Sequence, residues 1–336
     1  MKNILYIGNL LSQKGKTQTT IDTLSENLRA EGFTVYAFSN KTNKLLRFVD
    51  MLFAVLKYAK KVDYVLIDTY STQNFYYAFF ISQLCRFLKL KYIPILHGGN
   101  LPNRLKSNPA LSAAIFSNAY KNVSPSLYIT SEFETQGHSN IIYIPNAIAV
   151  KNYPFKQRPH EPVKLLWVRS FSKLYNPLLA VKLLKALKDE GLQASLCMVG
   201  PEGDGTLKEA QNLAKALQVD VAFTGKLSKG AWIHLSEDYN IFINTTNFDN
   251  MPVSVMEAMA LGLPIVSTNV GGMPFLIEHG HDGMLVNPNN LEEFVNAILW
   301  IITHPNDTKT MALNARKKVE QFDLETVKRE WHSLLR

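Results

Sequence analysis

The amino-acid sequence predicts an α/β protein with two consecutive domains, each built on a parallel β-sheet. Short apolar runs rich in β-branched residues alternate with helical patterns of about 10–15 residues, which is typical of βαβ units. The runs Val65–Asp68 and Tyr92–Leu96 are almost continuously apolar, as expected for strands that helices cover on both faces. The alternation stops once, in the segment Pro145–Pro162, which holds four prolines, and then restarts. This segment is the expected linker between the domains.

The first half of the chain alternates strand and helix patterns from Asn3 onward. The expected strands are Asn3–Ile7, Thr34–Phe38, Tyr64–Asp68, Tyr92–Leu96, Leu127–Thr130 and Ile141–Ile144. The expected helices are Thr20–Glu31, Leu45–Ala59, Thr72–Phe87 and Ala110–Lys121. This order predicts a Rossmann-like domain over residues 1–150.

The second half repeats the same alternation after the linker. The expected strands are Lys164–Val168, Ala194–Val199, Val221–Thr224, Ile241–Asn244 and Pro264–Ser267. The expected helices are Pro177–Glu190, Gly205–Leu217, Lys229–Glu237, Pro252–Ala260 and Leu291–Thr303. Ligands of open parallel sheets bind beyond the carboxyl ends of the strands, so we expect the site in a cleft between the two domains.

Composition and cysteine use indicate a globular protein of a reducing compartment. The 336 residues are 46% hydrophobic and 19% charged, and this length is enough to build two cores. The two cysteines, Cys85 and Cys197, lie in apolar runs, which argues against a disulfide framework or a zinc site. The sequence begins on a strand pattern without a signal peptide, and its longest apolar stretch, Phe75–Leu84, is too short to span a bilayer. We therefore expect a cytoplasmic protein.

The net charge of +8 lies entirely in the first half of the chain. Residues 1–150 hold 16 basic and 8 acidic side chains, whereas residues 151–336 hold 20 of each. Such an excess favours an acidic partner or substrate, and a solvated basic surface is the alternative. The segments Arg47–Lys61 and Phe75–Lys91 are apolar with basic ends, so they are either core helices or a peripheral contact with an anionic membrane leaflet. No aromatic and basic recognition motif supports binding of nucleic acid.

The first loop contains a Gly-Lys-Thr tripeptide at positions 15–17, between a strand pattern and a helix pattern. A nucleotide-binding P-loop requires another glycine five residues before the glycine of this tripeptide, and Leu10 stands there. The spacing therefore argues against an NTPase. The loop is then either an anion-binding loop or a simple turn.

The segment from Asn247 to Ile277 carries the clearest chemical pattern in the sequence. Asp249 and Glu257 stand eight positions apart, and Pro252 suits the first turn of the helix between them. The loop Phe248–Met251 then presents a helix N-terminus, whose backbone donors suit an anion or sugar hydroxyls. Because helical side chains lean toward the N-terminus, both carboxylates are expected to line one site.

The stretch from Asp249 to Val266, which continues as EAMALGLPIV from Glu257, resembles the E-x7-E signature of the retaining glycosyltransferases with a GT-B fold, glycosyltransferase family 4 (group 1). Further segments resemble this family in the same order along the chain: His97–Gly99, Ile144–Ile148, Leu166–Lys173, Val199–Gly203, Phe223–Lys226 and the last helix, Glu325–Leu335. A single match would be weak, but ordered matches over nearly the whole chain are specific.

The resemblance implies a GT-B fold, in which two Rossmann-like domains face each other across a cleft. Residues 1–150 would form the acceptor-binding domain, residues 151–318 the nucleotide-sugar-binding domain, and residues 319–336 a terminal helix returning to the first domain. The implied reaction is retaining transfer of a hexose-type sugar from a UDP- or GDP-sugar to a saccharide or lipid-linked acceptor. The donor would be a substrate, so no separate cofactor is expected.

The resemblance also implies a set of site residues. His97, Asp249 and Arg169 are the implied catalytic residues. The implied donor-binding residues are Gly15, Lys16, Arg169, Lys173, Gly200, Lys226, Asn250, Met251, Pro252 and Glu257. On the acceptor side we expect Asp68 and Asn100, and a turn role for Asp68 is equally open.

Two departures from the family pattern bear on activity. Asp249 replaces the usual glutamate, and Leu174 stands where the family has a diphosphate-binding lysine, with Lys173 one position earlier. The sequence contains no D-x-D triplet, so the leaving diphosphate is expected to depend on Arg169 and helix dipoles without a metal. These two departures favour one alternative, an inactive protein that binds nucleotide sugars. The basic charge of the first half of the chain favours another, an anion-binding protein.

Overall fold

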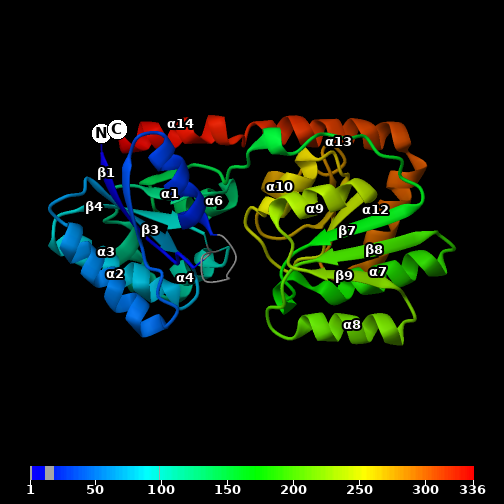
Figure 1. Cartoon of the computed structure of the whole chain (residues 1–336), viewed down its shortest axis with the longest axis horizontal. Helices are drawn as coiled ribbons and strands as arrows, with labels where there is room; N and C mark the ends of the chain where they lie inside the picture. Colours follow the sequence, from blue (N-terminus) through cyan, green and yellow to red (C-terminus); the bar gives the residue numbers. More distant parts are fainter. Residues whose placement is uncertain (1, 12–18, 98) are drawn as a thin grey trace. The chain divides into compact units, whose positions relative to one another are not determined.

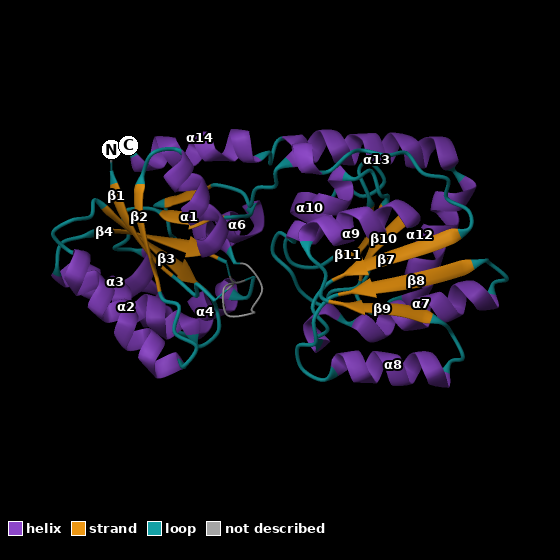
Figure 2. Ribbon diagram, viewed as in Figure 1, coloured by secondary structure: helices purple, strands orange, loops and turns teal. Residues whose placement is uncertain are grey.

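The chain forms two compact units, which Figures 1 and 2 draw in one view. The computed structural model describes residues 2–11, 19–97 and 99–336. Unit 1 comprises Met1–Pro145 together with Glu325–Arg336, and unit 2 comprises Asn146–Leu324. Within the described part of the chain, no helix has the length and apolar character that crossing a membrane requires.

Unit 1 is built on a parallel sheet with the strand order β2-β1-β3-β4-β5-β6. Its strands are β1 (Asn3–Ile7), β2 (Thr34–Phe38), β3 (Tyr64–Thr69), β4 (Lys91–Leu96), β5 (Asn122–Ser124) and β6 (Ile141–Tyr143). Its helices are α1 (Thr20–Ala30), α2 (Lys44–Tyr58), α3 (Asn74–Phe87), α4 (Leu101–Ser107), α5 (Pro109–Phe116), α6 (Leu127–Thr135) and the terminal α14 (Leu324–Leu335). One core lies between α2, α3 and the sheet, where Val55 and Ile81 pack with strand residues such as Ile7.

Unit 2 repeats this architecture with the strand order β12-β11-β10-β7-β8-β9, again parallel throughout. Its strands are β7 (Val163–Val168), β8 (Ala194–Val199), β9 (Val221–Gly225), β10 (Ile241–Asn244), β11 (Ile265–Thr268) and β12 (Met284–Val286). Its helices are α7 (Pro177–Asp189), α8 (Thr206–Ala216), α9 (Lys229–Leu235), α10 (Val253–Ala260), α11 (Met273–Leu276), α12 (Leu291–Thr303) and α13 (Pro305–Glu320).

Successive residues of β7 serve two different cores, because side chains alternate between the faces of a sheet. Leu165 and Trp167 pack into the core that includes Leu184 of α7. Leu166 packs into the other core with Met256 of α10. The continuous apolar run of this strand follows from burial on both faces. The predicted α/β architecture with two parallel sheets is therefore confirmed.

One predicted strand is wrong. Residues Leu127–Thr130, predicted as a strand, form the first turn of α6. The Ser126 hydroxyl accepts a hydrogen bond from the Ile129 N–H at 3.2 Å and so caps this helix. Ile129 and Phe133 are the buried residues of α6, four positions apart, which is the helical spacing. The short apolar run alone did not distinguish the repeat of a strand from the repeat of a helix.

Other boundaries differ from the sequence expectation. The predicted helix Ala110–Lys121 ends at Phe116 as α5, and β5 follows it. Helices α4, α11 and α13 and strands β5 and β12 were not predicted. Helix α13 ends at Glu320 within unit 2, and the part of the chain that joins unit 1 begins at Glu325.

Candidate active site

The site in unit 2 lies at the carboxyl ends of its central strands. Arg169 directly follows β7, Gly200 follows β8, and Thr245 follows β10. Because all these strands are parallel, their carboxyl ends meet at one edge of the sheet. The Gly200 N–H donates to the Gly225 carbonyl at 2.9 Å, and its backbone lies against the Arg169 carbonyl.

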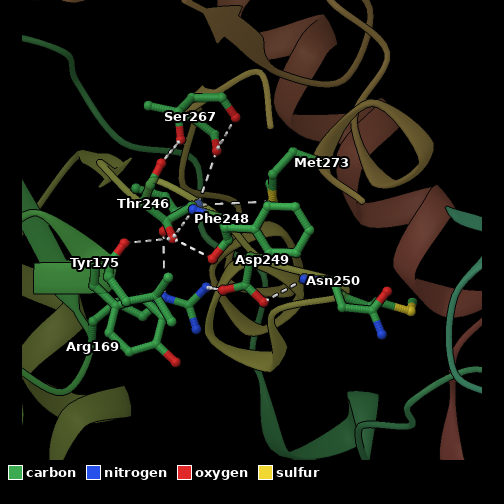
Figure 3. A network of polar contacts seen from close by, with 12 residues as sticks. Arg169, Tyr175, Thr246, Phe248, Asp249, Asn250, Ser267 and Met273 are labelled. Carbon is green, nitrogen blue, oxygen red and sulfur yellow. Dashed lines mark hydrogen bonds and ion pairs between the residues drawn. The ribbon is translucent and has the colours of Figure 1, made fainter. Parts of the chain in front are cut away.

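Arg169 is held by three neighbours, and Figure 3 shows it pointing toward Asp249. Its Nη2 forms an ion pair with Asp249 Oδ2, and the two side chains are only 12% and 16% exposed. Its Nε donates to Asn244 Oδ1 at 3.3 Å, and the guanidinium lies 4.7 Å from the centroid of the Tyr175 ring. The planar fork is therefore oriented before any ligand arrives.

The loop that carries Asp249 is fixed from both sides. Asp249 Oδ1 accepts a hydrogen bond from the Asn250 N–H at 2.8 Å. The Gly272 N–H donates to the Asp249 carbonyl at 2.9 Å. A Cβ on residue 272 would lie 1.7 Å from the Asn250 carbonyl oxygen, so only glycine permits this approach of the two loops.

Buried hydroxyl and amide groups beneath the loop complete the network of Figure 3. Thr246 Oγ1 donates to the Phe248 carbonyl at 2.8 Å, and Thr268 Oγ1 donates to the Thr246 carbonyl at 2.6 Å. Asn244 Nδ2 donates to Ser267 Oγ at 2.9 Å. These contacts tie the ends of β10 and β11 to the loop and explain why polar residues are buried there.

Helix α10 begins directly after this loop. Pro252, predicted in the first helical turn, is the residue before the helix, which starts at Val253. The N–H groups of Val255 and Met256 donate to the Pro252 carbonyl at 3.1 and 3.3 Å, so the first two N–H groups of the helix are the ones that an anion can use. The Ser254 hydroxyl at the same end is buried and has no hydrogen-bond partner among the described residues. Met251, just before, is buried, and its carbonyl accepts from Asn146 Nδ2 at 3.1 Å.

Glu257 lies inside α10 with 3% of its surface exposed. Tyr153, after the 3₁₀ turn Val150–Asn152, donates from its hydroxyl to Glu257 Oε1 at 2.7 Å. Lys229, the first residue of α9, forms an ion pair with the same oxygen. Burial, and then the neighbouring carboxylate, raise the pKa of Tyr153 well above its usual range, so this hydroxyl keeps its proton. Both contacts use Oε1, so neither Tyr153 nor Lys229 occupies the other oxygen, Oε2.

Two further basic residues that were predicted to bind the donor lie in the described part of unit 2. Lys173 lies in an exposed 3₁₀ turn, where its backbone N–H donates to Asp204 Oδ2 at 2.9 Å. Lys226 is exposed and directly follows β9. Among the described residues, neither lysine forms an ion pair with Asp249 or Glu257.

Unit 1 presents a second polar cluster at the carboxyl ends of β3 and β4. His97 follows β4, and its Nε2 lies 2.8 Å from Asp68 Oδ1 near the end of β3, with side chains 8% and 2% exposed. The Tyr6 hydroxyl of β1 donates to the same oxygen at 2.8 Å. The Tyr70 ring lies 5.3 Å from the His97 ring, between centroids. Burial, followed by the charge of Asp68, raises the pKa of Tyr70 well above its usual range.

Asp68 therefore lies beneath His97, where it fixes the imidazole. Its Oδ2 is buried and has no hydrogen-bond partner among the described residues. A Cβ at Gly8 would lie 2.3 Å from this oxygen, so the glycine leaves the space that the carboxylate fills. Asn100 precedes α4, and its side-chain oxygen accepts from Asn103. Gly15 and Lys16 lie outside the described residues.

One group of side chains has the spacing of metal ligands. The ligand atoms of Glu278, His281 and Asp282 lie within 4.8 Å of one another in the described part of the chain. Lys318 Nζ already pairs with Asp282 Oδ2 at 2.5 Å, and Asp282 Oδ1 accepts from the Glu278 N–H at 2.8 Å. The buried carboxylate thus serves a structural ion pair and a turn.

Comparison with known protein families decides the identity. The model of the family described as "Glycosyl transferases group 1" matches residues 150–318, which is half of the chain. This chain belongs to that family. The matched region contains Arg169, Asp249 and Glu257, and it coincides with most of unit 2.

Curated relatives match this group 1 glycosyl transferase over shorter stretches. An "Uncharacterized glycosyltransferase" of Haemophilus influenzae is 33% identical over 137 residues, which are 40% of this chain and 38% of that protein. The UDP-Gal:alpha-D-GlcNAc-diphosphoundecaprenol alpha-1,3-galactosyltransferase of Escherichia coli is 26% identical over 121 residues, or 35% of this chain and 30% of that protein. The chain thus matches well under half the length of these relatives.

Solved structures match the whole group 1 chain at low sequence identity. Sucrose-phosphate synthase from Thermosynechococcus elongatus superposes with a TM-score of 0.81 at 16% identity, covering 99% of this chain and 98% of that one. HepE of Anabaena, in complex with UDP and glucose, superposes with a TM-score of 0.80 at 18% identity, covering 100% and 99%. The predicted GT-B fold is thereby confirmed.

The sequence missed two residues of this group 1 site. Tyr153 is 104 positions from Glu257, and Lys229 is 28 positions from it. Tyr153 stood in the proline-rich linker and Lys229 at the start of an exposed helix, so neither residue belonged to a motif. A signal for these partners could have come from the apolar neighbours of Glu257 in EAMALGLPIV, because a carboxylate buried among apolar residues needs partners from elsewhere in the fold.

Proposed function

We propose that this protein is a retaining glycosyltransferase that moves a hexose-type sugar from a UDP- or GDP-sugar to a saccharide or lipid-linked acceptor without a metal. Unit 2 binds the nucleotide sugar and unit 1 the acceptor, and the protein works in the cytoplasm, in peripheral contact with the membrane. The Arg169–Asp249 pair beside the N-terminus of α10 carries the proposal, because it gathers the groups that a sugar diphosphate needs.

Arg169 and the α10 N-terminus act on the leaving diphosphate. The guanidinium offers a fork of N–H donors, and the helix start adds backbone donors and a positive dipole end. Both groups are fixed before the reaction, so they stabilise developing charge on the diphosphate without reorganisation. A diphosphate that engages Arg169 replaces Asp249, whose carboxylate then becomes free to accept hydroxyls of the transferred sugar.

Glu257 and His97 bind other parts of the donor. Glu257 Oε2 accepts hydrogen bonds from the ribose diol, while Tyr153 and Lys229 hold Oε1. In unit 1, Asp68 holds His97 by Nε2, so the Nδ1 face of the ring is left to contact the donor sugar or its phosphate. One similar protein is named as a UDP-Gal galactosyltransferase, and the similar HepE structure is a complex with UDP and glucose, which supports a UDP-linked donor.

A donor screen tests the proposed reaction. The full chain is incubated with UDP- and GDP-sugars, with and without EDTA, and nucleotide release is followed. We expect release from one donor class at a rate that EDTA does not change, and about a hundredfold loss in Glu257→Ala. If wild type and Glu257→Ala release nucleotide equally slowly, the proposal that the protein is an enzyme is refuted. The anomeric configuration of the product, read by NMR, tests retention.

An inactive nucleotide-sugar-binding protein is the second candidate. The neutralisation of Arg169 by Asp249 and the presence of Leu174 in place of the family lysine favour it. Calorimetry separates the two: this candidate requires micromolar nucleotide affinity that Arg169→Ala lowers, together with no release from any donor when saccharide and lipid-linked acceptors are supplied. Unchanged affinity in Arg169→Ala removes Arg169 from the donor site under both candidates.

A further inference from the structure

Exposed apolar side chains concentrate on two neighbouring helices of unit 1. Thirteen large hydrophobic side chains of the described residues are exposed, and eight of them lie on α2 and α3. Five belong to α2: Leu45, Leu46, Val49, Phe53 and Leu56. Phe53 alone exposes 61% of its surface. A contiguous apolar face of this kind marks an interaction site.

Helix α2 is apolar on opposite sides. At about 100° per residue, Val49, Phe53 and Leu56 fall on one side of the helix, and the buried Met51 and Val55 fall on the other. The buried side packs into the unit 1 core, so it accounts for only half of the apolar pattern. A helix that is apolar all round is covered on both sides in its working state.

Helix α3 continues the same surface. Tyr76, Phe80 and Phe87 are its exposed hydrophobics, spaced at i, i+4 and i+11, and Phe87 is 82% exposed. The ring of Phe48 on α2 lies 5.4 Å from that of Phe80, centroid to centroid, and the two helices lie side by side in Figure 1. The eight exposed side chains therefore form one surface, the α2–α3 face.

Exposed basic residues lie beside the carboxyl ends of the two helices that carry the α2–α3 face, and we call them its basic rim. Residues 41–61 contain six lysines and arginines and one acidic residue, and residues 74–91 contain three basic and no acidic residues. Lys57, Lys60, Lys61, Arg86 and Lys89 are exposed near the carboxyl ends of the two helices. An apolar stripe with a basic rim is the pattern of helices that lie in the interface of an anionic membrane. A symmetric dimer would instead bring two copies of the same basic rim together.

We propose that the α2–α3 face docks on an anionic lipid bilayer. The apolar stripe, about 17 Å long from Leu45 to Leu56, enters the boundary between headgroups and acyl chains. The lysines and arginines of the rim contact the anionic headgroups. This inference specifies the membrane contact of the proposed function, but its test needs no transferase activity, so the two can fail separately.

Vesicle sedimentation tests the apolar part of the face. The full chain is mixed with vesicles of phosphatidylglycerol and phosphatidylcholine, or of phosphatidylcholine alone. We expect wild type to bind the mixed vesicles, and the double variant Val49→Gln/Phe53→Gln to bind about tenfold more weakly. The control Leu127→Gln changes an exposed apolar residue of α6, 45% exposed, and should bind like wild type. Equal binding of wild type and the double variant overturns the proposal.

Neutral substitutions test the basic rim. Each lysine near an anionic leaflet contributes about a fivefold change in binding, so Lys57→Gln/Lys60→Gln should bind roughly thirtyfold more weakly. The control Lys208→Gln/Lys215→Gln removes two exposed charges from α8 and should leave binding unchanged. Binding that is equal for both vesicle types, or unaffected by salt, contradicts the proposal.

Sedimentation velocity distinguishes the bilayer from a second copy of the chain. A wild type that is dimeric without lipid, and that Val49→Gln/Phe53→Gln converts to a monomer, assigns the face to self-association and overturns the proposal. A monomeric wild type that binds anionic vesicles supports it. Unchanged thermal unfolding of the variants confirms that they fold, because the substituted side chains lie outside the core.

Discussion

Asp249→Asn should strengthen the binding of diphosphates while it weakens turnover. Asp249 neutralises Arg169 in the ligand-free site, so an incoming diphosphate has to displace it. Asparagine keeps the size of the side chain and can still accept from the Asn250 N–H, but it removes the competing charge. The two effects have opposite signs, so a general loss of structure cannot produce both.

The magnitude follows from the burial of the pair. A hydrogen bond between charged groups contributes about 1.5–3 kcal/mol, and solvent screens this pair little, since its side chains are 12% and 16% exposed. Asparagine retains part of the contact with Arg169, so the lower end of the range applies. We expect the affinity for UDP, GDP or inorganic pyrophosphate to rise about tenfold. Turnover should fall about a hundredfold, because the proposed function assigns this carboxylate to the hydroxyls of the transferred sugar.

Calorimetry at constant ionic strength provides the measurement. Asp189→Asn is the matched control, because it removes the same charge from a carboxylate that pairs with Lys185 and does not touch Arg169. Pyrophosphate affinity that stays level or falls in Asp249→Asn would refute the displacement of Asp249. An equal rise of the pyrophosphate affinity in Asp189→Asn would show that the change in net charge causes the effect.

Three further substitutions test how the site residues are held. Asp68→Asn should lower turnover about tenfold and shift the tautomer balance of His97, read from its ring ¹⁵N signals, because the carboxylate that fixes Nε2 is neutralised. Gly272→Ala should lower the free energy of unfolding by about 2 kcal/mol, measured in urea, because its Cβ meets a carbonyl at 1.7 Å. Tyr153→Phe should lower the same free energy by about 1 kcal/mol and weaken nucleotide binding, because Glu257 loses a buried donor.

Each of these substitutions has a control elsewhere in the chain. Asp63→Asn changes a carboxylate just before β3, which accepts from the Asn3 N–H at 2.8 Å, and should leave turnover intact. Gly230→Ala adds a Cβ with nothing within 4 Å. Tyr76→Phe removes a hydroxyl from an exposed ring. If a control and its partner behave alike, the named contact is not the cause.

The sequence predicted correctly where strands β7 and β4 end. Arg169 and His97 each follow an apolar run that has to be a strand, and the carboxyl ends of parallel strands form the ligand edge. Glu257 was predicted to line the site because it lies within about two turns of the predicted N-terminus of a helix. The strand ends follow from local spacing alone, whereas the assignment of Arg169 and His97 to a site came from the resemblance to the glycosyltransferase family.

The partners of these side chains could not be predicted from spacing. Asp68 and His97 are 29 positions apart, and each lies at the end of its own strand. Only the order β3-β4 in the sheet makes them neighbours. The wrong strand prediction at Leu127–Thr130 has a different cause. Four apolar or β-branched residues are too few to distinguish the two-residue repeat of a strand from the 3.6-residue repeat of a helix. The helix is identified by its cap, the Ser126 hydroxyl.

The contacts of the site also explain why long side chains can act in it. An arginine that is free in solution loses about 2 kcal/mol of rotamer entropy when it becomes fixed. Arg169 is already fixed by Asn244, Tyr175 and Asp249. Its side chain therefore loses this rotamer entropy when the protein folds, and not when a ligand binds. In the same way, the hydrogen bond from Tyr153 fixes the side chain of Glu257 before a ligand binds. Of these neighbours only Asp249 competes with a diphosphate, because Asn244 and Tyr175 orient the guanidinium without neutralising its charge.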